Sequence, residues 1–390
     1  MRHAVARVPF YRQLAIVPES IRSAADLQRF PVISKATIQE DQGKFLADGV
    51  DRTKLESSVT SGSTGQPTTT YFDRQSWLHG KYTLKILRMV QNGVGLFSRV
   101  MIASEYSPDL VNAGSTGFLP GDRLLFRQRR ISVHEPPAQH VEAFEAFRPH
   151  ALYTFPSYVS ELIGYCEEHS IALPRIPVVF TSSEVLSDRL RQRIAQYFGA
   201  RVCDVYGSTE LKEVAWQCGE GRHHINFDNV FVEHVGDEDL GHDFLVLSTL
   251  RNRAMPLLRY RIGDIGRVKE GACPCGRQSP FISAISGREV DLLELPSGRR
   301  VSPYVLITHR IDHTPEIRKY QFVQTSPNSL EIQVTLGRDG AGIDRLQPIA
   351  DEVADRLGGE MLVRMVDVDH IPRTERGKHR LLIRSAAEPA

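Results

Sequence analysis

Short apolar segments alternate with helical patterns between residues 100 and 206, and this alternation constrains the fold more than any other feature. Strands are expected at Val100–Ala103, Ala151–Phe155, Val178–Thr181 and Arg201–Tyr206, with helices at Ser157–Glu168 and Ser187–Tyr197. Strands separated by helices favour a mainly parallel sheet that is covered on both faces. Ligands of such sheets gather at the carboxyl ends of the strands.

The pattern changes after Glu213, where strands rich in β-formers are separated by Gly and Asp turns. An antiparallel sheet is expected from Val230–Val235, Phe244–Thr249 and Leu257–Val268. From Gly287 a smaller α+β module begins, with strands in Val290–Leu295, Gln321–Leu336 and Leu362–Asp367 and a helix at Ile343–Leu357. We therefore expect an α/β protein with a large domain over residues 1–286 and a small mobile domain over residues 287–390.

The amino-terminal part reads as short helices and turns, with a helix cap at Ser34 and a longer helix at about Arg74–Gln91. The first residues are basic and lack a secretory apolar core, which favours a solvated arm or first helix over a transit peptide. The net charge of +1 gives no general attraction to nucleic acid or to an anionic membrane. No apolar run approaches the roughly 20 residues that span a bilayer. Five cysteines fit a reducing compartment, so a cytoplasmic location is expected.

The segment Ser57–Thr70, SSVTSGSTGQPTTT, is dominated by Ser, Thr and Gly. Its many hydroxyls and accessible backbone N–H groups suit a loop that wraps an anion. It lacks the Gly-Lys-Ser/Thr ending of the best-known phosphate loop. A flexible Ser/Gly linker is the alternative, and apolar sequence on both sides argues against it.

Five motifs follow one another along the chain, namely TSGSTGQPT, TSSE, DVYGSTE, RYRIGD and PRTERGK. In this order and spacing the chain resembles the adenylate-forming superfamily of acyl-CoA synthetases, peptide-synthetase adenylation domains and luciferases. Within it, the chain is most similar to the phenylacetate–CoA ligase family and its capsule-biosynthesis relatives. The run CPCGR at 273–277, followed by SGRE, points to that branch. The resemblance covers nearly the whole chain.

The resemblance implies that ATP activates a carboxylic acid, by family analogy an aromatic one, to an acyl-adenylate. The thiol of CoA would then take the acyl group, and Mg²⁺ would assist the first step. Such nucleotidyl transfer depends mainly on positioning and electrostatics. The corresponding phosphate-binding residues would be Ser61, Gly62, Ser63, Thr64 and Gly65. Thr209 would contact the α-phosphate and Glu210 would hold Mg²⁺, whereas without the motif Glu210 reads as a solvated loop carboxylate.

The nucleoside would lie against a second group of residues implied by the same resemblance. Asp264 would accept hydrogen bonds from the ribose hydroxyls, although Gly-Asp alone is usually a turn signal. Tyr206 would stack on adenine, although a tyrosine that ends a strand is more often part of the core. The other ATP-site positions are Ser183, Glu184, Asp204, Gly207, Ser208 and Arg288.

Lys378 in PRTERGKHR matches the lysine that comes from the small domain and meets the α-phosphate and the carboxylate. A basic solvated tail is the alternative. Gly287-Arg288 resembles the hinge about which the small domain rotates. Here Val290 takes the place of the usual acid, with Asp291 next, and LELPSGRRV replaces a Gly-rich stretch. These departures leave open which residue pivots and how CoA would be received.

The cysteines and one histidine suggest a metal site formed by Cys218, His224, Cys273 and Cys275. Three thiolates and an imidazole suit tetrahedral Zn²⁺, and four protein ligands indicate a structural site. Spacing alone leaves four unrelated residues as the alternative, and the resemblance selects His224 over His223. Cys166 and Cys203 read as buried thiols.

Two other functions stay open beside the CoA ligase. The activated acyl group could pass to an amine, an alcohol or a carrier-protein thiol, or the chain could be a nucleotide-binding scaffold without catalysis. Intact Glu210, Asp264 and Lys378 argue against the scaffold. The acid is not identified by the sequence, and a homodimer is one of the open oligomeric states.

Overall fold

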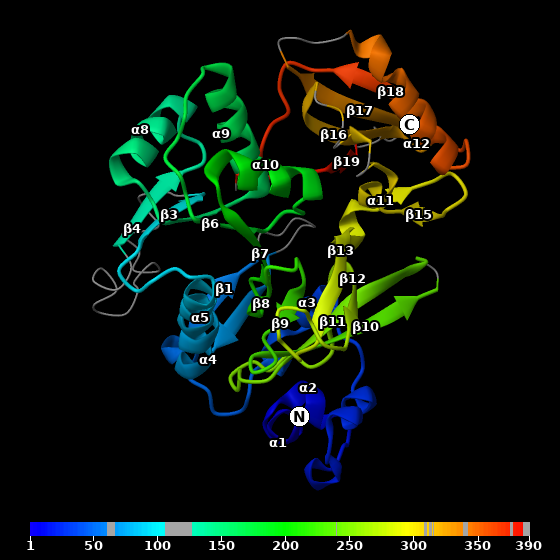
Figure 1. Cartoon of the computed structure of the whole chain (residues 1–390). Helices are drawn as coiled ribbons and strands as arrows, with labels where there is room; N and C mark the ends of the chain where they lie inside the picture. Colours follow the sequence, from blue (N-terminus) through cyan, green and yellow to red (C-terminus); the bar gives the residue numbers. More distant parts are fainter. Residues whose placement is uncertain are drawn as a thin grey trace. The chain divides into compact units, whose positions relative to one another are not determined.

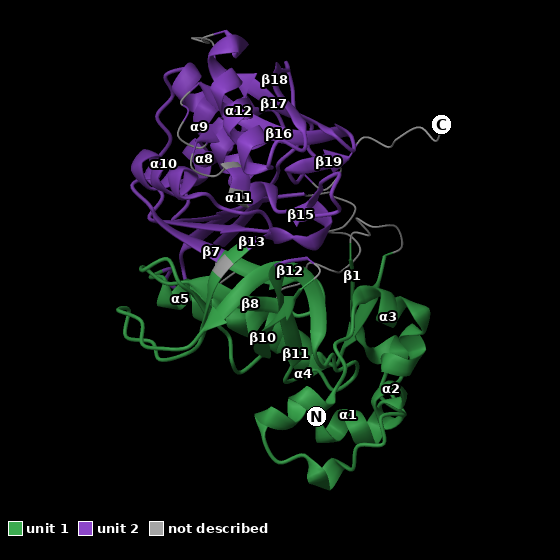
Figure 2. Ribbon diagram, turned by 90° about the vertical axis from the view of Figure 1, so that its right-hand side faces the viewer, with its two compact units in different colours: residues 1–93, 205–238, 242–285 green, residues 94–204, 239–241, 286–390 purple. Residues whose placement is uncertain are grey.

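The computed structural model describes residues 1–60, 67–105, 127–238, 240–307, 310–311, 314, 316–337, 342–374 and 377–384. The chain forms two compact units (Figure 2). Unit 1 comprises residues 1–93, 205–238 and 242–285, and unit 2 comprises residues 94–204, 239–241 and 286–390. Residues 94–204 thus group with the carboxyl-terminal part, and the predicted domain boundary after residue 286 stays a prediction.

Unit 1 begins with the short helices and turns that were expected. They are α1 (Arg2–Arg7), α2 (Pro9–Arg12), η1 (Pro18–Ser20), η2 (Ala24–Arg29), α3 (Lys35–Glu40), η3 (Gln42–Phe45) and η4 (Arg52–Lys54). Ser34 caps α3, because its hydroxyl accepts the backbone N–H of Thr37, as predicted. Buried apolar side chains of this segment, such as Tyr11, Phe30 and Phe45, pack against those of the β-rich part.

Strands β1 (Glu56–Val59) and β2 (Thr69–Phe72) pair antiparallel and flank the Ser/Thr/Gly loop. The helix expected at Arg74–Gln91 consists of three segments, α4 (Arg74–Leu78), the π-helical η5 (His79–Thr83) and α5 (Leu84–Gln91). Residues 61–66, which include the predicted phosphate-binding Ser61, Gly62, Ser63, Thr64 and Gly65, lie outside the described residues.

The strands of unit 1 follow the order β10-β11-β12-β13-β9-β8-β7 (Figure 1). Their bounds are β7 (Arg201–Ser208), β8 (Lys212–Gln217), β9 (His223–Ile225), β10 (Val230–Asp237), β11 (His242–Thr249), β12 (Tyr260–Lys269) and β13 (Phe281–Arg288). The pairs β10–β11 and β11–β12 are antiparallel, as predicted. The pairs β13–β9, β7–β8 and β8–β9, which the sequence did not predict, are antiparallel as well. Strand β7 crosses the unit boundary, since Asp204 belongs to unit 2 and Val205 to unit 1.

Unit 2 contains parallel strands in the order β6-β5-β3-β4. They are β3 (Arg99–Ser104), β4 (Arg127–Ser132), β5 (Ala151–Thr154) and β6 (Val178–Ser182), with helices α8 (Pro137–Phe147), α9 (Pro156–Glu168) and α10 (Asp188–Phe198). The βα alternation predicted a parallel sheet with β3, β5 and β6, whereas β4 was not expected. A core of buried side chains such as Leu152, Leu162 and Val179 joins these strands and helices.

The carboxyl-terminal part of unit 2 is an α+β module with a four-stranded sheet in the order β18-β17-β16-β19. Its elements are η6 (Glu289–Asp291), β14 (Leu293–Glu294), β15 (Arg300–Val301), α11 (Pro303–Ile307), β16 (Ile317–Ser326), β17 (Ser329–Leu336), η8 (Ile343–Leu346), α12 (Gln347–Arg356), β18 (Leu362–Asp367) and β19 (Leu382–Arg384). The strand expected at Val290–Leu295 is reduced to β14, which follows a 3₁₀ turn. Among the described residues, no helix is long and apolar enough to span a membrane.

Candidate active site and metal centre

In unit 1, the YGSTE segment (residues 206–210, below called the GSTE motif) and the RYRIGD motif (residues 259–264) each contain a tyrosine and a carboxylate. The tyrosine of each motif donates a hydrogen bond to the carboxylate of the other. Tyr260, at the start of β12, donates its hydroxyl to Oε1 of Glu210 at 2.9 Å. Tyr206, near the end of β7, donates its hydroxyl to Oδ2 of Asp264 at 2.6 Å. All four side chains are buried. Because a buried carboxylate is costly without hydrogen-bond donors, these bonds fix both acids at defined positions.

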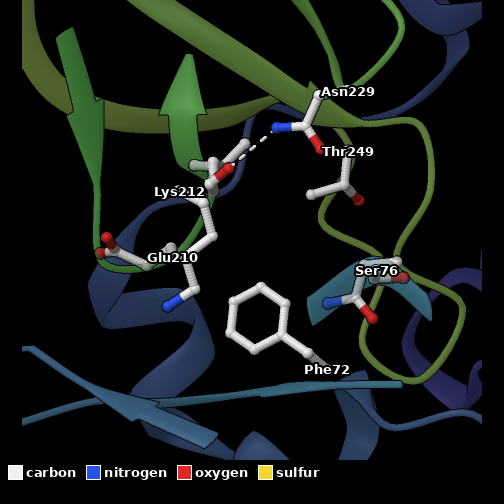
Figure 3. Close-up of a pocket in the computed structure, with 8 residues that line it drawn as sticks. Phe72, Ser76, Glu210, Lys212, Asn229 and Thr249 are labelled. Carbon is white, nitrogen blue, oxygen red and sulfur yellow. Dashed lines mark hydrogen bonds between the residues drawn. The ribbon is translucent and has the colours of Figure 1, made fainter. Parts of the chain in front are cut away.

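A cation that the sequence analysis did not single out lies beside this pair. Lys212 lines a small pocket together with Glu210 and Phe72 (Figure 3). Its ammonium donates to the backbone oxygen of Thr209 at 3.1 Å and to the hydroxyl of Ser58. Lys212 therefore links strand β1, through Ser58, to the backbone of the GSTE motif at Thr209.

The surroundings of this ammonium are unusual for a lysine. It lies 4.5 Å from the ring centroids of both Phe72 and Trp77. Burial first, and then repulsion by Lys81, lower the pKa of Lys212 to about 7, while the Glu210 carboxylate opposes the shift. The only sequence signal for this residue was its position two residues after Glu210.

In unit 2, the predicted TSSE segment lies at the carboxyl end of β6. Thr181 donates its hydroxyl to Oδ1 of Asp204 at 2.7 Å, which joins β6 to β7. Ser183 has a φ of +73°, in the left-handed region that few residues other than Gly adopt. Glu184 accepts the backbone N–H of Ser157 at 2.8 Å and its hydroxyl at 2.9 Å. It also accepts the backbone N–H of His379 at 2.7 Å, and burial raises its pKa.

Lys378 follows a tight turn of the carboxyl-terminal module. Gly377 donates its N–H to the oxygen of Thr374 at 2.7 Å, and Thr374 donates to the oxygen of Lys378 at 2.8 Å. The N–H of Lys378 reaches the Thr374 hydroxyl at 3.1 Å. Gly377 has a φ of +70°, and a Cβ added there would lie 2.5 Å from Cγ2 of Val133. Only glycine fits this place without displacement of Val133.

The predicted hinge also depends on a glycine. Gly287 has a φ of +99°, and a Cβ there would lie 2.5 Å from the ring of Tyr304. Arg288, the next residue, is exposed and precedes the turn η6. The stretch LELPSGRRV forms the two-stranded hairpin β14–β15, in which Leu293 is opposite Val301.

The structure places the predicted site residues in both units. Unit 1 holds Tyr206, Gly207, Ser208, Thr209, Glu210 and Asp264, and unit 2 holds Ser183, Glu184, Asp204, Arg288 and Lys378. The structure joins Tyr206 to Asp264 within unit 1, and Glu184 to the peptide group that follows Lys378 within unit 2. The roles of these residues toward ATP, Mg²⁺ and the acid stay predictions.

The four predicted metal ligands lie together in unit 1. The ligand atoms of Cys218, His224, Cys273 and Cys275 are all within 4.8 Å of one another. The sulfurs of Cys218 and Cys273 are 3.8 Å apart, and Sγ of Cys275 is 3.4 Å from Nε2 of His224. These spacings match the edges of a tetrahedron with zinc–sulfur bonds of about 2.3 Å and zinc–nitrogen bonds of about 2.0 Å.

Local structure explains how two distant segments meet at this cluster. Cys218 begins a turn closed by its N–H to the oxygen of Arg222, and Cys273 begins a matching turn closed to Arg277, both at 3.0 Å. Strand β9, which carries His224, pairs with β13 so that His224 is opposite Phe281. Nδ1 of His224 lies 3.1 Å from the Ser279 hydroxyl. That contact leaves Nε2 for the metal, a common arrangement of a histidine ligand and its partner.

Several known proteins are similar to this chain over most of its length. A phenylacetate–coenzyme A ligase of Thermus thermophilus is 25% identical over 416 residues, which cover 97% of this chain and 92% of the relative. Protein CapK of Staphylococcus aureus is 23% identical, with 93% of this chain and 81% of the relative covered. The chain is thus similar over most of its length to phenylacetate–CoA ligases and to CapK. The family model of the CapK C-terminal domain matches residues 293–385.

The fold agrees with this family. The solved structure of a 2-hydroxyisobutyryl-CoA ligase, in the postadenylation state with 2-HIB-AMP, matches with a TM-score of 0.80 at 21% identity. The match covers 99% of this chain and 87% of the ligase. The expected α/β class with a separate carboxyl-terminal module is therefore confirmed. The family's sequence motifs lead to Glu210 and Asp264, whereas their tyrosine partners become evident only in three dimensions.

Proposed function

We propose that this protein uses ATP to convert a carboxylic acid, by family analogy an aromatic one, into an acyl-adenylate and then passes the acyl group to the thiol of CoA. AMP and pyrophosphate are the other products. The observation that carries this proposal is the pair of buried motif carboxylates, Glu210 and Asp264, each fixed by a tyrosine of the other motif. The activity in the names of the ligase relatives supports the same reaction.

In the first step, a carboxylate oxygen of the acid attacks the α-phosphorus of ATP, and the bond to pyrophosphate breaks. Asp264 would accept hydrogen bonds from the ribose, and Thr209 would contact the α-phosphate. The ammonium of Lys378 would stabilise the charge that develops between the acid and the α-phosphate, because a fixed charge acts most strongly where water is excluded. In the second step, the CoA sulfur attacks the acyl carbon, its proton is lost, and AMP leaves.

The residues present fit the two metals that the family implies. Glu210 is a hard oxygen ligand suited to Mg²⁺ beside phosphate, and Mg²⁺ would neutralise charge on the phosphate oxygens. The Cys218, His224, Cys273 and Cys275 cluster suits Zn²⁺, with Ser279 as the hydrogen-bond partner of the histidine. We assign the zinc a structural role, because four protein ligands would leave no open position.

A second acyl acceptor is suggested by one feature of the structure. The segment after the predicted hinge is the hairpin β14–β15 instead of a Gly-rich stretch. Since this segment would help to form the surface that receives CoA, an amine, an alcohol or a carrier-protein thiol is the alternative acceptor. A homodimer and a cytoplasmic location stay predictions.

The experiment that tests the proposal measures pyrophosphate release with ATP, Mg²⁺ and a panel of acids, each with and without CoA. The panel includes phenylacetate, benzoate and 2-hydroxyisobutyrate, together with longer aliphatic acids. At least one acid should release pyrophosphate above the acid-free control, and CoA should convert the acyl-adenylate to a thioester visible by mass spectrometry. Acid-dependent release without a thioester would favour the alternative acceptor. ATP binding without any acid-dependent release would overturn the enzymatic proposal in favour of a nucleotide-binding scaffold.

A further inference from the structure

The peptide groups on both sides of Lys378 each form a hydrogen bond with a side chain, that of Arg373 on one side and that of Glu184 on the other. On one side, Nη1 of Arg373 donates to the oxygen of Gly377 at 3.0 Å. On the other side, the N–H of His379 donates to Oε1 of Glu184 at 2.7 Å. The backbone of Lys378 is therefore bracketed by two side-chain contacts, in addition to the bonds with Thr374.

Arg373 is itself fixed by a carboxylate on helix α9. Nη2 and Nε of Arg373 lie 2.7 and 3.3 Å from Oε2 of Glu161. Lys319 of β16 donates to the other oxygen of Glu161 at 2.9 Å and to the backbone oxygen of Ile371 at 2.8 Å. Although burial acts in the opposite direction, Arg373 and Lys319 lower the pKa of Glu161. One carboxylate thus neutralises two cations, and the Arg373 and Lys319 side chains are only 11% and 14% exposed.

Glu184 is anchored to the same helix. It accepts both the N–H and the hydroxyl of Ser157, in the first turn of α9. Helix α9 therefore supports two points of contact, Glu161 for the segment before Lys378 and Glu184 for the segment after it. Both contacts lie within unit 2.

We propose that Glu161, on α9, and Glu184, which follows β6 and is anchored to α9 through Ser157, are positioning residues that hold the Lys378 peptide between them during acyl-adenylate formation. The inference rests on the proposed function, in which Lys378 acts at the α-phosphate. Misplacement of a reacting group by about 1 Å can cost on the order of a hundredfold in rate. Because Glu161 acts through Arg373, its loss should lower the rate of adenylation more than it changes ATP binding.

The test compares Glu161→Gln with the matched variant Glu168→Gln. Glu168 lies on the same helix and pairs with Arg318 of the same carboxyl-terminal module at 3.1 Å. Glu168→Gln therefore controls for the loss of an ion pair between α9 and the module. The probe acid is the one that gives most pyrophosphate with the parent enzyme.

Glu161→Gln should lower kcat for acyl-adenylate formation roughly tenfold, with KM for ATP changed less than about twofold, whereas Glu168→Gln should stay near the parent. Thioester formation from supplied acyl-adenylate should be retained. In an Arg373→Gln background, Glu161→Gln should have little further effect, because the two residues act in series. Equal rates in Glu161→Gln and Glu168→Gln, or fully additive losses, would overturn the inference.

Glu184 is tested by Glu184→Ala and Glu184→Gln. Glutamine keeps an acceptor oxygen for the His379 N–H, so it should retain more adenylation than alanine does. Hydrogen exchange of peptides that cover residues 377–381 gives a readout that needs no acid. Exchange should be faster in Glu161→Gln and Glu184→Ala than in Glu168→Gln. Unchanged hydrogen exchange would contradict the positioning role even if the protein forms an acyl-adenylate. Because exchange needs no acid, it tests the two contacts even if no acid is activated.

Discussion

The hydroxyl of Tyr260 lies 2.9 Å from Oε1 of Glu210, so a residue of the RYRIGD motif orients the carboxylate of the GSTE motif. Both side chains are buried, with Tyr260 only 2% and Glu210 only 7% exposed. The tyrosine removes rotational freedom from the carboxylate and satisfies one of its two oxygens. The proposed magnesium ligand is therefore positioned before any metal arrives.

Tyr260→Phe should raise the Mg²⁺ concentration needed for half-maximal pyrophosphate release severalfold. It should also lower the free energy of unfolding by about 1 kcal/mol or somewhat more. A neutral hydrogen bond usually contributes about 1 kcal/mol net, and a bond to a charged acceptor contributes more. Magnesium titrations of the parent and the variant measure the first effect, and thermal melts measure the second. Tyr165→Phe, on α9 of the other unit, is the control. An unchanged magnesium midpoint would contradict this role of Tyr260.

Lys378→Ala should reduce acyl-adenylate formation by roughly a hundredfold or more, the scale of losing one contact to transition-state charge. ATP binding should change little, because the ammonium is assigned to the reacting groups. The neighbouring Arg380→Ala is the matched variant, since Arg380 is exposed and belongs to the same basic run. Comparable losses in both variants would support the solvated basic tail instead of a specific contact. Single-turnover formation of acyl-AMP is the measurement.

Helices and strands could be predicted from the sequence where their residues form a continuous apolar run or a regular periodic pattern. β6 is an example, since all five of its residues are buried. β4 was missed because it reads Arg-Gln-Arg-Arg-Ile-Ser, and only Ile131 of that strand is buried. Among the described strands β4 is the last in the sheet order and pairs only with β3, so its other edge needs no apolar pattern.

The site residues likewise include some that the sequence indicated and others that only the fold revealed. Glu210 was proposed from the family motif, and the four metal ligands were proposed from their residue types, their spacing and the resemblance; the structure brings those four side chains together. Lys212 and Glu161 were missed, because an isolated lysine or a helical glutamate reads as a solvated surface residue. Their partners are distant in sequence, at Ser58 and at Arg373 respectively. Such contacts are created by the fold and leave no local pattern.

His379 should make the protein less stable in mild acid. Burial first, and then the charges of Lys319 and Arg373, lower its pKa from 6.5 to about 4, while Glu161 opposes the shift. Between these values the unfolded chain binds more protons than the folded one, so stability falls as the pH falls from about 6.5 toward 4. The loss between pH 8 and pH 5 is about 1 to 2 kcal/mol by the same linkage.

Thermal melts of the parent and His379→Gln at pH 8 and pH 5 measure this effect. The melting temperature of His379→Gln should depend less on pH than that of the parent, because glutamine does not titrate. His370→Gln, at an exposed position of the same unit, is the control and should keep the pH dependence of the parent. Equal pH dependence in all three proteins would show that His379 is not the group responsible.

The metal cluster gives the most direct prediction, because it needs no substrate. Cys218 and His224 precede Cys273 and Cys275 by 49 or more residues along the chain, and β10, β11 and β12 lie between them. A metal bound by both segments would close this long loop, which restricts the unfolded chain, and its binding would be coupled to folding. Protein purified without chelator should contain about one zinc per chain.

Cys275→Ser should lose that zinc and melt at a lower temperature, because one of four ligands is removed from a site that spans two segments. Cys166→Ala, at a buried thiol of the other unit, should keep the zinc. At temperatures where Cys275→Ser stays folded it should still form acyl-adenylate, since a closed four-ligand site has no place for substrate. Elemental analysis is the measurement, and zinc binding should weaken in acid as thiolates and imidazole take up protons. An active and stable preparation with less than about a tenth of an equivalent of any transition metal would refute a structural zinc at this cluster.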